Sequence, residues 1–100
     1  MRCYWVYLLR CHDASFYVGI TNDVDRRVAE HNLGLSPFAH TYFRRPVVCV
    51  WASSFDSPNA AIDFEKQLKG WSRAKKEALI RGDWPQIALL SKGHPSTSSG

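Results

Sequence analysis

The chain has 100 residues, of which 45% are hydrophobic, and a chain of this length has room for one hydrophobic core, so we expect a single domain. Its formal net charge of +4 and its pI near 9.2 are a modest basic excess that favours polyanionic partners. No apolar run approaches the ~20 residues that span a bilayer and the N-terminus lacks a signal-peptide pattern, which argues against membrane-spanning and secreted classes and predicts a cytoplasmic protein.

The three cysteines, Cys3, Cys11 and Cys49, are odd in number and contain no C-x-x-C pair. This spacing argues against a disulfide framework and against a zinc knuckle, and buried or idle thiols are the better interpretation. His12 and His31 form no common metal-ligand spacing with these cysteines, which argues against a metal site of that kind.

The basic surplus is concentrated in the second half of the chain. Residues 57–100 hold seven basic and four acidic side chains, whereas residues 1–56 hold six and five. A basic face that suits a phosphate backbone and an ordinary solvated helix surface explain this distribution equally well.

Two short segments near the N-terminus predict a β-hairpin. Residues 4–10 and 15–20 are rich in aromatic and β-branched side chains, and a short polar break around Asp13 separates them. Because side chains alternate across a strand, Tyr7 and Tyr17 share a sheet face only in some hairpin registers, and the sequence leaves the register open.

A short amphipathic helix is expected over residues 24–32. The sequence Thr21-Asn22-Asp23 supplies capping side chains before it, and valines four residues apart form its apolar side. Arg27 and His31 are also four residues apart, so they lie one above the other on one face of this helix.

Residues 33–46 contain a glycine and two prolines and are expected to form an ordered loop. Residues 47–55, with the sequence VVCVWASSF, predict a third strand that joins the hairpin in one sheet. The near-continuous apolar start of this strand predicts burial on both of its faces.

A longer helix is expected after the third strand. Ser57 is a suitable N-cap, and Pro58 stands at the first helical position. The periodicity predicts one apolar stripe along this helix, formed by Ala61, Phe64, Leu68 and Trp71.

Gly70 marks a break before a second helix, which Ser72 caps and which ends at Gly82. Residues 91–100 are too polar to pack and are expected to form a disordered tail. The order β-β-α-loop-β-α-α predicts an α+β fold over residues 1–90, with a small three-stranded sheet flanked by helices.

The hairpin and the first helix carry a recognisable pattern. Trp5-Val6-Tyr7 and Tyr17-Val18-Gly19, followed by Arg27, resemble the signature of the GIY-YIG nuclease family. The resemblance covers residues 4 to about 90 and is to the stand-alone single-domain members, which are related to the nuclease domain of UvrC and to intron-encoded endonucleases. Further matches are RRPV at 44–47, Glu65, and WSRAKKEALI from Trp71 to Ile80.

The resemblance implies a divalent-metal-dependent endonuclease that hydrolyses DNA phosphodiester bonds. By this resemblance, Tyr17 is the general base for the attacking water or the group that positions it by a hydrogen bond. Arg27 contacts the scissile phosphate, and Glu65 holds the metal ion, Mg²⁺ or Mn²⁺. Tyr7 matches the tyrosine of the first half-motif, and His31 matches a position close to the site.

The chemistry of phosphodiester hydrolysis suits these residue types. A hard cation takes oxygen ligands, keeps several waters and needs only one or two carboxylates, so Glu65 is a sufficient anchor. Arg27 offers a permanently charged fork whose geometry suits phosphate oxygens. Tyrosine has an ordinary pKa of about 10 and is a poor base at neutral pH. A phenolate would therefore need the metal or a nearby cation, and Arg27 is the obvious neighbour.

Each of these residues also has a structural interpretation, which stays open. The two tyrosines fit half-buried sheet aromatics, and Arg27 fits an exposed helical arginine. Glu65 can pair with Lys69 at i, i+4 in an ordinary surface salt bridge, although its place beside the apolar stripe favours a functional role. His31 is either a proton-transfer group or a packed histidine.

Basic residues outside the motif are candidate contacts to flanking phosphates, and a plain surface charge is the simpler interpretation of any one of them. DNA is the expected partner, recognised through its structure or backbone in repair or recombination, with no membrane and no small-molecule cofactor. The alternative function is a catalytically inactive nucleic-acid-binding module on the same scaffold, and the oligomeric state stays open. The candidate contacts are Arg44, Arg45, Lys69, Arg73, Lys75 and Lys76.

Two positions depart from the family pattern. Trp5 stands where the first half-motif has glycine, and Ile20 stands where some members carry lysine. These departures bear on catalytic efficiency more than on the type of reaction.

Overall fold

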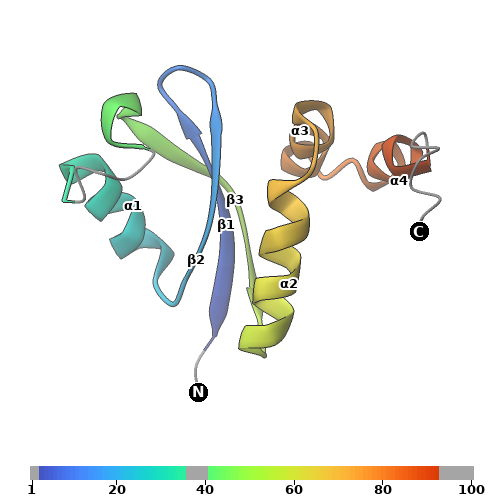
Figure 1. Ribbon diagram of the computed structural model, residues 1–100, viewed down its shortest axis with the longest axis horizontal. Helices are drawn as coiled ribbons and strands as arrows, with labels where there is room; N and C mark the ends of the chain where they lie inside the picture. The colour runs from blue at the N-terminus through green and yellow to red at the C-terminus, as the bar shows by residue number, and fades with distance from the viewer. Residues whose placement is uncertain (1–2, 36–40, 93–100) are drawn as a thin grey trace. The chain divides into compact units, whose positions relative to one another are not determined.

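The computed structural model describes residues 3–35 and 41–92 of the chain. The chain is divided into two compact units, Met1–Lys69 and Gly70–Gly100. The first unit holds a sheet and the helices α1 and α2, and the second holds the helices α3 and α4 (Figure 1). The single domain expected over residues 1–90 stays a prediction.

A three-stranded antiparallel sheet forms the middle layer of the first unit. Its strands are β1 (Tyr4–Cys11), β2 (Phe16–Thr21) and β3 (Val47–Phe55), in the order β2-β1-β3. The central strand β1 is the most buried, and its residues 6–9 are at most 1% exposed. The predicted α+β class and the predicted three-stranded sheet are confirmed.

The register of the hairpin places the two motif tyrosines on one face of the sheet. Tyr7 pairs with Gly19, and Leu9 pairs with Tyr17. Residues directly opposite each other in an antiparallel pair point to the same side, as do residues two apart along a strand. Tyr7 and Tyr17 therefore share a face, in a register that the sequence left open.

A tight turn closes the hairpin between β1 and β2. The Asp13 carboxylate accepts hydrogen bonds from the backbone N–H and the hydroxyl of Ser15. Nε of Arg44 donates to the other Asp13 oxygen over 2.9 Å, and the His12 N–H donates to the Arg44 carbonyl. Ala14 in this turn has a φ of 70°. The tip of the hairpin is thus tied to the segment that precedes β3.

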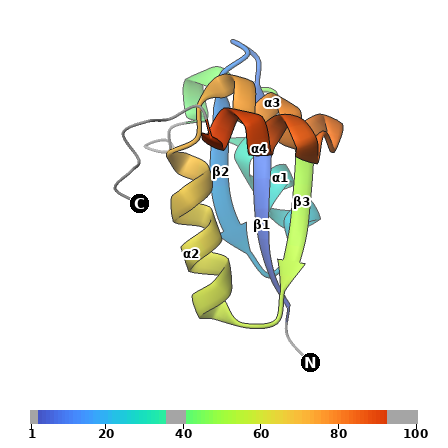
Figure 2. The same cartoon turned by 90° about the vertical axis from the view of Figure 1, so that its right-hand side faces the viewer.

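Helix α1 (Val24–Leu33) covers one face of the sheet (Figures 1 and 2). Its N-cap is Asp23, one of the capping residues that the sequence predicts, and Gly34 ends it in a left-handed conformation. Val24 and Val28 on its inner side pack against a buried cluster formed by Tyr7, Leu9, Cys11 and Val47.

Helix α2 (Pro58–Lys69) packs against the opposite face of the sheet (Figures 1 and 2). The Ser57 hydroxyl accepts hydrogen bonds from two N–H groups of its first turn, which confirms the predicted N-cap. Ala61 and Leu68 on the inner side are fully buried. The prediction that Trp71 continues this stripe is wrong, because the helix ends at a glycine turn before that residue.

Strand β3 is less buried than its apolar start predicts. Val47 is 2% exposed, but Val48 is 59% exposed, and most of the following residues are half-buried. The predicted burial on both faces is wrong, because β3 lies at the edge of the sheet, where no further strand shelters its side chains. The side chain of Asn32 fastens α1 to this strand: it donates to the Val47 carbonyl over 3.0 Å and accepts from the Val47 N–H over 2.7 Å.

Part of the loop expected over residues 33–46 lies outside the described residues, namely 36–40. The described part ends in a 3₁₀ turn, Tyr42–Arg44. Nε of Arg45 donates to the Tyr42 carbonyl over 2.7 Å, and its guanidinium lies 4.5 Å from the centre of the Tyr42 ring. These contacts order the segment that leads into β3.

The second unit contains α3 (Arg73–Arg81) and α4 (Trp84–Lys92). Ser72 caps α3, and Gly82 ends it in a left-handed conformation, as predicted. No helix of the described residues combines the length and the apolar character that a bilayer crossing requires.

The sequence patterns above do not predict α4. The Asp83 carboxylate accepts a hydrogen bond from the Gln86 N–H at its start, and Pro85 stands in its first turn. An N-cap acid followed by an early proline is typical of a helix start and was the available signal. The helix includes residues 91–92 at the start of the expected tail, and residues 93–100 lie outside the described residues.

Candidate active site

Three rings from three elements meet on the sheet face that α1 covers. The centres of the Tyr7 and Tyr17 rings are 6.4 Å apart, and the His31 ring is 6.4 Å from Tyr7 and 5.2 Å from Tyr17. Tyr7 is 1% exposed and His31 is 8% exposed, whereas Tyr17 is half-buried. Tyr17 is therefore the ring of the three that a substrate can reach.

Gly19 makes room for Tyr7 in this arrangement. The two residues face each other across the hairpin, and the Tyr7 ring lies over the Gly19 backbone. A Cβ atom at position 19 would lie 2.6 Å from Cζ of Tyr7, well inside van der Waals contact. The glycine of the second half-motif is thus a packing requirement of the tyrosine of the first.

Arg27 approaches the same rings from α1. A hydrogen bond with Tyr7 raises the pKa of Arg27, whereas burial raises the pKa of Tyr7 and this hydrogen bond opposes it. Because a guanidinium has only donors, the Tyr7 oxygen accepts this hydrogen bond. Nη1 of Arg27 also donates to Glu30 over 3.1 Å, and the Arg27 side chain is 43% exposed. The guanidinium is therefore held in place and still accessible to an anion.

His31 lies between two buried hydroxyl groups. Its Nδ1 is 2.7 Å from Oγ1 of Thr41, and its Nε2 is 3.4 Å from the Tyr7 oxygen. Burial lowers the pKa of His31 and the charge of Arg27 lowers it further, which favours the neutral imidazole. Thr41 is 1% exposed and belongs to the site, although no spacing in the sequence singles it out.

Glu65 belongs to α2, the helix that packs against the other face of the sheet (Figure 2). Its Oε2 pairs with Nζ of Lys69 over 2.6 Å, and its side chain is 16% exposed. The pKa of Lys69 is raised mainly by this hydrogen bond with Glu65 and further by Tyr17, so Lys69 is within electrostatic reach of both. The Glu65–Lys69 pair is thus linked electrostatically to Tyr17 through Lys69.

The donor set suits a hard divalent cation held by few protein ligands. The described residues contain no cluster of three or more His, Cys, Asp or Glu side chains that would enclose a metal ion, and Cys3, Cys11 and Cys49 are free thiols. Mg²⁺ accepts one carboxylate together with waters and substrate phosphates. Glu65 fits this requirement, since its second oxygen takes no part in the 2.6 Å contact with Lys69.

The two arginines expected to hold flanking phosphates in the loop have structural contacts. Arg44 is 39% exposed and forms the ion pair with Asp13 at the hairpin tip. Arg45 stacks on Tyr42 and donates from Nη1 to the Asn32 carbonyl at the end of α1 over 3.4 Å. Both side chains therefore have structural contacts in the described part of the chain, and their contact with nucleic acid stays a prediction.

Of the three basic residues expected to hold phosphates in the second unit, two have contacts within it and the third is partly buried. Nε of Arg73 pairs with Glu77 over 3.1 Å, and Nζ of Lys75 lies 4.3 Å from the centre of the Trp71 ring. Burial lowers the pKa of Lys76. Their role in nucleic-acid binding stays a prediction as well.

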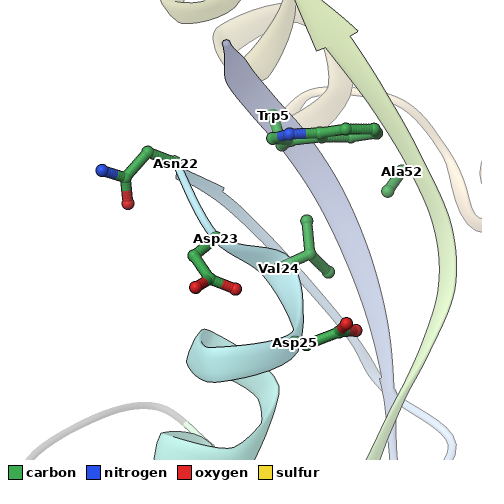
Figure 3. A pocket seen from close by; sticks show the side chains of 6 residues that line it. All are labelled: Trp5, Asn22, Asp23, Val24, Asp25 and Ala52. Atoms are coloured by element: carbon green, nitrogen blue, oxygen red, sulfur yellow. The ribbon is translucent and has the colours of Figure 1, made fainter. Parts of the chain in front are cut away.

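A pocket of about 320 Å³ lies at the N-terminal end of α1 (Figure 3). The indole of Trp5 and the side chains of Val24 and Ala52 form its apolar part. Asn22, Asp23 and Asp25 add polar groups, and the two carboxylates have the wrong sign for a phosphate. The pocket contains neither motif tyrosine and neither Arg27 nor Glu65.

Comparison with known proteins adds relatives of similar length. A UPF0213 protein of Natronomonas pharaonis is 46% identical over 77 residues, which cover 77% of this chain and 89% of the relative. A UPF0213 protein of Staphylococcus saprophyticus is 36% identical over 80 residues, which cover 80% and 96%.

Two solved structures are similar to the chain. The solution NMR structure of a UPF0213 protein from Bacillus halodurans has a TM-score of 0.52 and 39% identity, and the match covers 79% of this chain and 83% of that one. The solution NMR structure of a protein from E. faecalis has a TM-score of 0.58 and 31% identity, with coverage of 82% and 86%. The sequence model of the GIY-YIG catalytic domain matches residues 3–78. The resemblance seen in the motifs is confirmed, and the chain belongs to the GIY-YIG family, a family of nucleases.

Proposed function

We propose that the chain is a divalent-metal-dependent endonuclease that hydrolyses phosphodiester bonds of DNA. The observation that carries this proposal is the meeting of Tyr7, Tyr17, Arg27 and His31 on one face, with Lys69, the ion-pair partner of Glu65, within electrostatic reach of Tyr17. Phosphodiester hydrolysis needs an oriented water, a cation on the phosphate and a carboxylate for a metal ion, and these residues supply all three.

The more exposed residues of this site would contact the substrate, and the buried residues would hold them in position. Tyr17 is the accessible phenol and orients the attacking water by a hydrogen bond. As a phenolate stabilised by the metal ion or by Arg27, it would take the proton of this water as the bond to phosphorus forms. Arg27 donates to the non-bridging phosphate oxygens through the exposed part of its guanidinium. Tyr7 and His31 are too buried to touch the substrate, so they hold Arg27 and Tyr17 in position.

Glu65 is the residue that would hold Mg²⁺ or Mn²⁺. The ion would supply positive charge next to the phosphate and the leaving oxygen. Lys69 pairs with the same carboxylate, so a bound ion and this ammonium compete for it. Lys69 is 57% exposed and is free to swing towards a phosphate once it leaves the carboxylate.

The basic side chains would bind the sugar-phosphate backbone and not the base edges. The chain has a net charge of +4. Asp23 and Asp25 of the pocket beside Trp5 repel phosphates from the N-terminal end of α1. Backbone contact gives affinity without sequence information, so the substrate class is structured DNA, such as the branched or nicked molecules of repair and recombination. The proposed contacts are Arg44, Arg45, Lys69, Arg73, Lys75 and Lys76.

A cleavage assay on branched, nicked and single-stranded DNA with Mg²⁺ or Mn²⁺ tests this proposal. We expect Glu65→Gln to lose more activity than the roughly 10–100-fold that loss of an outer-shell partner costs. Asp63→Asn is the matched control, because Asp63 is an exposed carboxylate on the same helix, and it should keep wild-type activity.

Equal activity of the wild type and Glu65→Gln would rule out the proposed site. Salt-sensitive DNA binding without cleavage under any metal condition would instead support the alternative, a catalytically inactive nucleic-acid-binding module.

A further inference from the structure

The His31 ring is held at both of its nitrogens inside the first unit. Oγ1 of Thr41 lies 2.7 Å from Nδ1, and the Tyr7 oxygen lies 3.4 Å from Nε2. The two hydroxyl-bearing residues are each 1% exposed, and the histidine is 8% exposed. In such a place the position of a single proton decides which nitrogen donates and which accepts.

Two neutral tautomers of His31 are compatible with these distances. In the first, Nδ1–H donates to Thr41 and Nε2 accepts from the Tyr7 hydroxyl. In the second, the Thr41 hydroxyl donates to Nδ1 and Nε2–H donates to the Tyr7 oxygen. Among the described residues, the first leaves the Thr41 hydrogen without an acceptor, and the second leaves the Tyr7 hydrogen without one.

Arg27 favours the first of these two tautomers over the second. Its guanidinium interacts with the Tyr7 oxygen and works against the rise that burial causes in the pKa of Tyr7, and its positive charge acts on His31 as well. The cation makes the phenol a stronger hydrogen donor and attracts the lone pair of Nε2, whereas it repels an Nε2–H group. A phenol is also a stronger donor than the aliphatic hydroxyl of Thr41, so its hydrogen is the more costly one to leave unpaired.

The geometry points to Thr41 as a positioning residue that holds His31 in the Nδ1–H tautomer. The two hydrogen bonds then run in one direction: Tyr7 donates to His31, and His31 donates to Thr41. The positive charge of Arg27 acts on the Tyr7 oxygen at the start of this series. This series of hydrogen bonds fixes the His31 ring, whose centre lies 5.2 Å from the centre of the Tyr17 ring in an edge-on contact. It also keeps the lone pairs of the Tyr7 oxygen turned towards Arg27. Its consequence for catalysis rests on the proposed function, whereas the tautomer itself does not.

NMR of the ¹⁵N-labelled protein tests the tautomer directly. Two-bond ¹H–¹⁵N spectra of the imidazoles, at about pH 7.5, one unit above the ordinary histidine pKa, show which nitrogen of His31 carries the proton. We expect Nδ1–H in the wild type and in Thr41→Ser, which keeps the hydroxyl. In Thr41→Val, which is close in shape but has no acceptor, the ratio of Nδ1–H to Nε2–H should fall about tenfold. The exposed His12 is the internal reference.

An Nε2–H tautomer in the wild type would overturn the proposal, and so would an unchanged ratio in Thr41→Val. If Thr41→Val fails to fold, the wild-type and Thr41→Ser spectra still decide the tautomer. A role of Thr41 in packing alone would change stability in Thr41→Val without moving the tautomer ratio.

The same variants separate this inference from the proposed nuclease activity. In a protein that cleaves DNA, Thr41→Val should lower kcat about tenfold with KM within twofold, and Thr41→Ser should restore kcat. Absence of cleavage in every variant would contradict the proposed function and leave the spectra as the test of the tautomer. Cleavage by Thr41→Val at the wild-type rate would contradict the positioning role.

Discussion

The contact between Gly19 and Tyr7 makes position 19 sensitive to a single methyl group. In Gly19→Ala the new Cβ would lie 2.6 Å from Cζ of Tyr7, so the ring must move. We expect the free energy of unfolding to fall by about 1–3 kcal/mol, the usual cost of overpacking, measured by urea denaturation. Tyr7→Phe removes the hydroxyl oxygen, the side-chain atom nearest to the new Cβ, so the loss in the double variant should be smaller than the sum of the single losses. Additive losses would show that the ring does not lie over residue 19.

The burial of His31 predicts a dependence of stability on pH. Burial and Arg27 lower its pKa in the folded state below the ordinary value of 6.5. At a pH between the folded-state pKa of His31 and the ordinary pKa, the unfolded chain binds more protons than the folded chain. The free energy of unfolding therefore falls as the pH drops through this range. We expect the His31 ring resonances to titrate with a midpoint below 6.5, and His31→Gln to lose this part of the pH dependence. A midpoint at or above 6.5 would contradict the buried, neutral imidazole.

For single residues, the sequence predicts the motif side chains but not the residues that hold them in place. Tyr7, Tyr17 and Arg27 follow from the resemblance, and the structure brings them together with His31. Thr41 escapes prediction because a hydrogen bond between residues ten apart across a loop leaves no periodic signal. The register of the hairpin escapes it as well, since a shift by one residue would reverse the face of every side chain.

The hairpin turn offers a prediction at the scale of one element. Ala14 has a φ of 70°, a left-handed conformation that costs a residue with a Cβ roughly 1–2 kcal/mol. Ala14→Gly removes this cost. Glycine also raises the conformational entropy of the unfolded chain, which offsets part of the stabilisation. We expect a net rise of about 0.5–1 kcal/mol in the free energy of unfolding.

The same substitution at Ala74 is the matched control. Ala74 is exposed in α3, where Ala→Gly should lower the free energy of unfolding by about 1 kcal/mol. The two variants should therefore change stability in opposite directions. A loss of stability in both would show that the turn at Ala14 is not strained.

Capping signals predict the helices better than hydrophobic runs predict burial. Asp23, Ser57 and Ser72 begin helices where their side chains suggest, because each satisfies a free N–H group of the first turn. The apolar start of β3 predicts too much burial, because its position at the edge of the sheet depends on pairing far along the chain. Helix α4 has an Asp83 cap that a stricter use of the same rule would have found.

For the whole molecule, the α+β class and the membership of the GIY-YIG family follow from the order of short motifs. The sheet has α1 on one face and α2 on the other (Figure 1), and Lys69 of α2 is within electrostatic reach of Tyr17 from a distant part of the chain. Sequence alone does not predict this meeting, because it depends on α2 crossing beside the edge strand β2. The central claim is that these groups serve one site for a hydrated cation.

Paramagnetic broadening by Mn²⁺ tests that claim most directly. With substoichiometric Mn²⁺, amide signals of the ¹⁵N-labelled wild type should broaden around Tyr17 and Glu65, and Glu65→Gln should abolish the effect while Asp63→Asn keeps it. Broadening centred on Asp23 and Asp25 at the other end of α1, or unchanged in Glu65→Gln, would contradict the account.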